Sequence, residues 1–199
     1  VHWRPSRLYA MARSKAYLSR AAEIRWSCDP KLLKDDDKTP AEAVLSYPNG
    51  LADMLKEITE GVTLVLPEAF TGRVDLDGGG AIEWAVVWSA NGFGGDADGF
   101  TRSYCNTIPT PEGGTHEAGM RSALTKALRA YGEMVNNKKT GMITADDVLG
   151  TAGALLSVFI RNPEFVGQTK EKLSTTDAFR ITENAMRDRF DHWLTASPK

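Results

Sequence analysis

The segment "FVGQTKEKL" contains side chains that could hold an anion, and it connects a predicted strand to a predicted helix. Lys170 could direct its ammonium group at a phosphate as a point charge. Gln168 could donate through its amide beside that lysine, and Gly167 allows the chain to turn sharply. The alternative is a solvated turn in which Lys170 and Lys172 flank Glu171. Spacing alone favours this second interpretation, because exposed charged residues are far commoner than phosphate sites.

Arg121 and Arg129 could contact a nucleic-acid backbone. They lie eight positions apart in a predicted helix with Thr125 midway, so all three are expected on its polar face. Such a stripe would bind phosphates without reading a base sequence. A solvated helix face is the commoner alternative. The chain has 26 Asp+Glu against 24 Lys+Arg, which gives no general support for DNA binding.

Motifs for metal or nucleophilic chemistry are missing from the sequence. His2, His116 and His192 have no partners at metal-ligand spacing, and His116 is interpreted as a capping or packing residue. There is no G-x-S-x-G elbow. "DLDGGG" lacks the glutamate of a calcium loop and is interpreted as a flexible turn. The glycines of "PEGGTHEAG" could hold a phosphate on free amides, but they lack the remainder of a P-loop.

Composition limits the class of protein. The chain has 199 residues, 42% of them apolar, which is enough for one large or two small domains. The net charge of -2 restricts any nucleic-acid contact to a local surface or another chain. Cys28 and Cys105 are far apart, which suits a reducing cytoplasm and argues against a disulfide scaffold or a zinc site. No apolar run approaches the ~18 residues of a membrane span.

The first 22 residues are rich in basic residues and contain no acid. A transit peptide can have this composition. However, positions 8, 11, 12, 15 and 18 have helical spacing, which predicts an amphipathic helix with a basic outer face. The opening "VHWRP" is strand-like, and the missing initiator Met indicates a fragment of something longer.

The remaining patterns predict alternating strands and helices. We expect paired strands in "AEIRWSCDP" and "AEAVLSYPNG", and then a short helix in "LADMLKEITEG". Residues 73–108 predict a hairpin joined by a glycine- and aspartate-rich linker, with Trp84, Val86 and Trp88 on one face of its first strand. Ala85 and Val87 would lie on the other face.

A long helix is expected after the hairpin, with Thr115 as its N-cap. A short helix starting at Thr144, a buried strand "ALLSVFI" and a final helix opened by Ser174 with Asp177 follow. From Gly61 onward this order predicts an α+β or α/β fold with helices on one side of a mostly antiparallel sheet.

Three long motifs resemble the transducer domain of bacterial type IIA topoisomerase B subunits, the family of gyrase B and topoisomerase IV B. They are "SYCNTIPTPEGGTHEAGMRSAL", "LSVFIRNPEFVGQTKEKL" and "ENAMRDRFDHWL", and the resemblance runs from about Gly50 to Trp193. "CNTIPTPEGGTH" and "VFIRNPEF" are more similar to topoisomerase IV than to gyrase. "VHWRP" and "SRLYAMARSKAYL" resemble the last strand and helix of the preceding ATP-binding domain. The family has a longer segment between these two pieces, whereas Pro5 here leads directly to Ser6.

The resemblance implies the fold. Residues 1–49 would end a GHKL ATP-binding domain, and residues 50–199 would form the transducer domain. The transducer is an α+β sandwich, with helices covering one face of a sheet and a left-handed β-α-β crossover of the ribosomal-protein domain-2 type. That hand is the uncommon one.

The resemblance also implies roles for residues. Gln168, Thr169 and Lys170 match the family's Q-T-K, which binds the terminal phosphate of ATP held in the neighbouring domain. Gln168 and Lys170 would also take part in hydrolysis, in which the ammonium of Lys170 offsets charge on the transferring group. The arginine at the place of Arg121 faces the cavity through which DNA passes, which supports a weak phosphate contact by Arg121 and Arg129. Residues 113–116 would chiefly shape the start of the helix.

The complete enzyme of this family uses ATP and Mg²⁺, and its metal ligands, catalytic glutamate and glycine-rich lid are expected outside this chain. No metal site is therefore expected here, and the fragment alone is expected to be inactive. The implied partners are DNA, the A subunit of topoisomerase IV and a second B subunit bound through the ATP-binding domain. The implied location is the cytoplasm, and the implied activity is ATP-dependent relaxation and decatenation of DNA. A gyrase B transducer and a non-catalytic binding module of the same fold are the alternatives.

Overall fold

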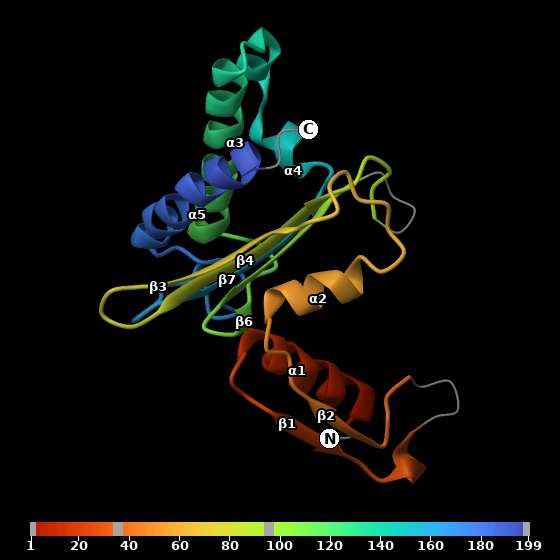
Figure 1. The fold of residues 1–199 in the computed structure, drawn as a ribbon. Helices are drawn as coiled ribbons and strands as arrows, with labels where there is room; N and C mark the ends of the chain where they lie inside the picture. Colours follow the sequence, from red (N-terminus) through yellow and green to blue (C-terminus); the bar gives the residue numbers. More distant parts are fainter. Residues whose placement is uncertain (1–2, 34–37, 94–97, 197–199) are drawn as a thin grey trace. The chain divides into compact units, whose positions relative to one another are not determined.

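The computed structural model describes residues 3–33, 38–93 and 98–196, and it divides the chain into two compact units (Figure 1). Unit 1 is Val1–Glu57 and unit 2 is Ile58–Lys199. The division lies near the end of helix α2 (Leu51–Ile58). The boundary expected between residues 49 and 50 lies just before that helix.

Unit 1 contains a helix and a two-stranded antiparallel sheet. Residues Ile24 to Ser27 pair with Leu45 to Glu42, which confirms the predicted pair of strands. The elements are α1 (Pro5–Leu18), β1 (Ile24–Ser27), the 3-10 turn η1 (Pro30–Leu32), β2 (Glu42–Leu45) and most of α2.

Helix α1 begins at Pro5, where a missing amide has no cost because the first helical amides have no intrahelical partner. Trp3 and Arg4 precede the helix without forming a strand. The prediction of a strand in "VHWRP" is therefore wrong for its described residues. Val1 and His2 lie outside the part of the chain that the structure describes.

The predicted helix in the N-terminal segment is confirmed, but its buried surface is shorter than expected. Met11 is 55% exposed, and burial is concentrated in the last turn at Tyr17 and Leu18. Arg13 and the hydroxyl of Tyr17 both donate to the carboxylate of Glu57 on α2. Partial burial opposes ionisation of Glu57, but these two hydrogen bonds outweigh it and lower the pKa of that carboxyl.

Unit 2 is built on a five-stranded sheet in the order β3-β4-β7-β5-β6. Among these strands only β5 and β7 are parallel neighbours, so the mostly antiparallel sheet is confirmed. The chain between β5 and β7 contains helices and so forms a β-α-β connection; its left hand stays a prediction. The strands are β3 (Phe70–Asp75), β4 (Ala81–Trp88), β5 (Phe100–Cys105), β6 (Ile108–Pro109) and β7 (Ala152–Phe159).

The predicted hairpin between β4 and β5 is wrong. Strand β4 pairs with β3 through a turn in which the amide of Leu76 donates to the carbonyl of Gly80 at 3.0 Å, so "DLDGGG" is a turn as expected. On its other side β4 pairs with β7, and β7 separates it from β5. The buried strand β7 comes from far along the chain and forms ladders on both edges, which excludes direct β4–β5 pairing. Residues 94–97 of the linker lie outside the described residues.

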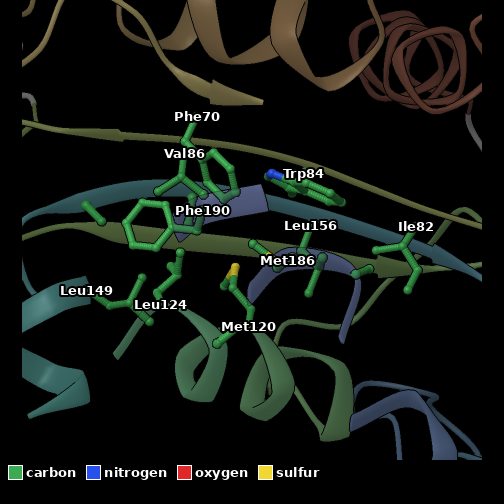
Figure 2. Close-up of a cluster of buried hydrophobic side chains, with 14 of the residues drawn as sticks. Phe70, Ile82, Trp84, Val86, Met120, Leu124, Leu149, Leu156, Met186 and Phe190 are labelled. Carbon is green, nitrogen blue, oxygen red and sulfur yellow. The ribbon is translucent and has the colours of Figure 1, made fainter. Parts of the chain in front are cut away.

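Helices α3 (Thr115–Met134) and α5 (Thr176–Ala196) lie together on one face of this sheet (Figure 1). Trp84 and Val86 of β4 are fully buried in the core between this face and the helices, and their shared face is confirmed. Figure 2 shows this core, which also contains Phe70, Ile82, Met120, Leu124, Leu149, Leu156, Met186 and Phe190.

Between α3 and β7 the chain forms the 3-10 turn η2 (Lys138–Met142) and the short helix α4 (Ala145–Leu149). Thr144 caps α4, with its hydroxyl accepting from the amide of Asp147 and the carboxylate of Asp147 accepting from the amide of Thr144. The predicted start of this helix at Thr144 is confirmed.

Candidate functional site

The residues predicted to bind phosphate lie in a closed loop that leaves β7 and returns to α5. Phe165 and Leu173 form an antiparallel bridge at its base, and the amide of Val166 donates to the carbonyl of Lys172 at 2.9 Å. The amide of Ser174 donates to the carbonyl of Glu164 at 2.8 Å. The loop therefore has a hydrogen-bonded stem, rather than being an open connection. We call residues 164–174 the Lys170 loop.

The tip of this loop presents donor groups to solvent. Gln168, Thr169 and Lys170 are all exposed. Gly167 and Lys170 have positive φ angles of 75° and 59°, so the chain reverses direction sharply on either side of the tip. The ammonium of Lys170 lies 5.9 Å from the centroid of the Phe165 ring, a cation–π contact that leaves its donors available. An amide, a hydroxyl and an ammonium together suit an anionic oxygen ligand.

The descending arm of the Lys170 loop is fixed to the segment that precedes α3. The amide of Glu112 donates to the carbonyl of Glu171 at 3.0 Å, and the amide of Leu173 donates to the carbonyl of Gly113 at 3.0 Å. The amide of Thr115 then donates to the carbonyl of Leu173 at 3.1 Å. These alternating bonds form a short parallel ladder that begins one residue after Lys170.

Two glycines allow this ladder. Gly113 and Gly114 have φ angles of 67° and 140°, which a residue with a Cβ rarely adopts. A Cβ on Gly114 would overlap the carbonyl oxygen of Leu173. Gly114, rather than Thr115, occupies the N-cap position, and the hydroxyl of Thr115 donates to the carbonyl of Thr175 at 2.7 Å. The predicted Thr115 cap is wrong because that hydroxyl joins α3 to the chain before α5.

A buried chain of polar side chains lies behind this anchor. The hydroxyl of Ser103 on β5 donates to the carboxylate of Glu117 at 2.6 Å and lies 2.6 Å from the hydroxyl of Thr110. The Thr110 hydroxyl in turn lies 3.1 Å from Nε2 of His116. The predictions made from the sequence did not include Ser103 or Thr110. Isolated hydroxyls in a strand and a turn give no pattern that identifies them.

Burial perturbs the two titratable groups of this chain. His116 is fully buried, which lowers the pKa of its imidazole to about 4 and keeps it neutral. Burial raises the pKa of the Glu117 carboxyl, against the opposing effects of the Ser103 hydrogen bond and the positive charge of Arg121. The interpretation of His116 as a packing residue agrees with this environment.

The two arginines predicted to contact DNA are engaged within unit 2. Arg121 forms an ion pair with Asp146 of α4, and its side chain is 39% exposed. The guanidinium of Arg129 donates to the carbonyl of Ile143, with Nε at 2.8 Å. Thr125 is buried and donates to the carbonyl of Arg121 at 2.7 Å, so its predicted place on a solvent-facing stripe is wrong. Helix α3 therefore presents these arginines beside α4 and η2.

Two negative observations bear on the site, both limited to the described residues. No group of three or more His, Cys, Asp or Glu side chains is placed to hold a metal ion there. In the same part of the chain, no helix combines the length and the apolar character that crossing a bilayer requires. Cys28 and Cys105 are free thiols.

A family profile and known sequences match most of the chain. The family profile described as DNA gyrase B matches residues 50–199. The whole chain is 59% identical over 200 residues to the B subunit of DNA topoisomerase 4 from Caulobacter vibrioides, of which it covers 28%. The alignment has 200 positions and this chain has 199 residues, so the alignment leaves no room for a long insertion in the relative. The longer segment that was expected between the positions of Pro5 and Ser6 is therefore absent from that relative.

Solved structures of topoisomerase IV and gyrase B ATPase regions are also similar to this chain. The topoisomerase IV ATP-binding domain of Francisella tularensis, in complex with a small-molecule inhibitor, is 28% identical with a TM-score of 0.77. The match covers 98% of this chain and 49% of that one. The 43K ATPase domain of Thermus thermophilus gyrase B, in complex with an aminocoumarin, is 27% identical with a TM-score of 0.74. That match covers 100% of this chain and 50% of the other.

Proposed function

Since the chain belongs to the DNA gyrase B family, we propose that it is part of the ATPase region of a type IIA DNA topoisomerase of the topoisomerase IV type. In this proposal residues 50–199 are the transducer domain and residues 1–49 are the end of a GHKL ATP-binding domain. The relative from Caulobacter vibrioides, a B subunit of DNA topoisomerase 4, supports the topoisomerase IV branch. The chain spans 28% of the length of that relative, and the activity of the complete protein is therefore proposed as well.

The Lys170 loop is proposed to contact the terminal phosphate of ATP held by the ATP-binding domain. The observation that carries this role is an exposed set of donors on a loop whose backbone is fixed on both arms. Gln168 and Thr169 would bind through neutral donors, and Lys170 would supply the positive charge. A fixed ammonium offsets charge that develops on a transferring phosphoryl group without reorganising as solvent would.

The Lys170 loop is also proposed to couple the hydrolysis of ATP to a movement of the domains. Loss of the terminal phosphate removes the ligand of Lys170, so the free energy that favours one arrangement of the domains is lost with it. Because the loop is bonded to the start of α3, the release would act on the helix that carries Arg121 and Arg129. Those arginines are proposed to make weak, sequence-independent contacts with a DNA segment.

The remaining requirements of catalysis are assigned to other parts of the complete enzyme. The family resemblance places the Mg²⁺ ligands in those parts, outside this chain. The proposed partners are DNA, the A subunit and a second B subunit that associates through the ATP-binding domain when ATP binds. The proposed outcome is relaxation and decatenation of DNA in the bacterial cytoplasm.

The substitution Lys170→Ala in the complete protein tests this role. We expect kcat for ATP hydrolysis to fall about a hundredfold, the scale measured for loss of one transition-state donor, with the free energy of unfolding nearly unchanged. Lys172→Ala is the matched control, because Lys172 is exposed in the same loop and only its carbonyl is used in the stem. ATP hydrolysis at the normal rate by the Lys170 variant would exclude the proposed role.

A further inference from the structure

The hydrogen bonds behind the Lys170 loop have a defined direction. An ionised Glu117 can only accept, so Ser103 gives its single proton to that carboxylate. Ser103 must then accept from Thr110, and Thr110 must accept from the Nε2–H of His116. Each hydroxyl donates once and accepts once, and His116 is left with an unprotonated Nδ1. That Nδ1 atom is buried and has no hydrogen-bond partner among the described residues.

The opposite direction is unfavourable. If Glu117 were protonated and donated to Ser103, Ser103 could donate to the carbonyl of Thr110 at 3.2 Å or to its hydroxyl, and in the second case the chain would end on Nε2 of His116 as an acceptor. The ring proton would then sit on Nδ1, where a buried N–H would have no acceptor among the described groups. An unsatisfied buried donor costs about 1–3 kcal/mol. The missing acceptor at Nδ1 therefore favours the tautomer with the proton on Nε2, which donates to Thr110 and fixes the His116 ring.

This chain is continuous with the backbone that fixes the Lys170 loop. Thr110 accepts at its carbonyl from the amide of Gly113 at 2.8 Å, and its own amide donates to the carbonyl of Ser103 at 2.9 Å. Gly113 then accepts from the amide of Leu173 in the loop. Thr110 thus joins β5 to the loop through its backbone and joins β5 to α3 through its side chain.

We propose that Thr110, inside the Glu117–Ser103–Thr110–His116 chain, is a positioning residue that sets the place of Lys170 for ATP hydrolysis. The inference rests on the proposed function of Lys170 and goes beyond it by naming what holds the ammonium in place. Buried polar groups cost free energy to desolvate, and apolar side chains would fill the same space without that cost. The hydrogen bonds of the polar chain are directional, so they specify one orientation of α3 against β5. The place of the Lys170 loop follows from that orientation.

A matched pair of variants tests the proposal. Thr110→Val removes the hydroxyl at nearly constant volume, and Thr110→Ser keeps it. Hydrogen exchange is measured at the amides of Glu112, Thr115 and Leu173 in the chain, and ATP hydrolysis is measured in the complete protein. We expect Thr110→Val to speed exchange at these amides and lower kcat about tenfold, with KM for ATP changed less than about twofold. Thr110→Ser should leave both the exchange rates and kcat close to those of the unaltered protein.

Two further variants keep the test decisive. Ser103→Ala breaks the same chain from β5 and should reproduce the effects of Thr110→Val if that variant folds poorly. Lys170→Ala should lower kcat with no change in exchange at the three anchoring amides. Unchanged exchange or unchanged kcat in both Thr110→Val and Ser103→Ala, beside an inactive Lys170→Ala, would overturn the positioning role and leave the role of Lys170 intact. A fully active Lys170→Ala would overturn both.

Discussion

Leu173 and Gly114 lie side by side in a parallel β-bridge that connects the end of the Lys170 loop to the first turn of α3. The bridge joins two segments that are far apart in the sequence and leaves no side chain between them. Lys170 precedes this connection by three residues, and Arg121 follows it on α3. A displacement of the start of α3 would therefore be transmitted to the loop through main-chain hydrogen bonds rather than through flexible side chains.

Replacing Gly114 by Ala should disrupt this connection. The new Cβ would overlap the Leu173 carbonyl oxygen, and the φ angle of 140° is strained for any L side chain. We expect the free energy of unfolding of unit 2 to fall by about 2 kcal/mol or more, as measured by urea denaturation. Gly141→Ala is the control, because a Cβ there would meet nothing within 4 Å. A Gly114 variant as stable as the control would contradict the close approach.

Replacing Arg121 by Ala should weaken the response of the complete enzyme to DNA. The side chain is partly exposed beside Asp146, so a DNA phosphate could compete for its guanidinium. We expect the ratio of the ATPase rate with DNA to the rate without DNA to fall several-fold. Arg180→Ala is the control, since Arg180 is an exposed arginine paired with Asp177 on α5. An unchanged ratio in the Arg121 variant would count against the DNA contact.

His116 should remain neutral in mildly acidic solution. Its pKa is lowered to about 4 by burial, so nitrogen NMR at pH 5 should show a neutral ring with the proton on Nε2. The unfolded chain takes up this proton near its ordinary pKa of 6.5, so this residue reduces stability as the pH falls from there towards 4. A protonated imidazole at pH 5 in the folded chain would show that the buried environment is wrong.

Glu183 should stabilise unit 2 in a pH-dependent way. Hydrogen bonds from Lys126 and Ser122 of α3, both 2.6 Å, lower the pKa of this α5 carboxyl below its ordinary 4.5. The contribution of a depressed pKa is present above the unfolded value and is lost as the pH falls through the folded value. Glu183→Gln should therefore be less stable than the unaltered chain at pH 7, and the difference should shrink in acid.

Chemical denaturation between pH 7 and pH 3 measures this difference. Glu133→Gln is the control, because it removes an exposed carboxylate from the same helix that Glu183 contacts. A Glu183→Gln difference that stays constant across this range would mean that the ionised carboxylate contributes nothing.

The sequence was sufficient for much of the local structure. Alternating apolar residues identified β4 and the face that holds Trp84 and Val86, and Thr144 placed the start of α4. These features depend on side chains within a few positions of each other, so periodicity and capping chemistry predict them. A resemblance of three motifs supplied the family, which the comparisons confirm.

Pairing of distant segments was decided only by the tertiary structure. The sequence suggested a β4–β5 hairpin, whereas β7 lies between those strands because it can form ladders on both of its edges. It placed Thr115 as a cap, whereas the glycine before it allows the backbone to meet Leu173. The sequence alone shows that Gln168, Thr169 and Lys170 are consecutive residues with hydrogen-bond donors. It does not show that the hydroxyls of Ser103 and Thr110 lie behind them, because a buried hydrogen bond depends on which distant atoms the fold brings within about 3 Å.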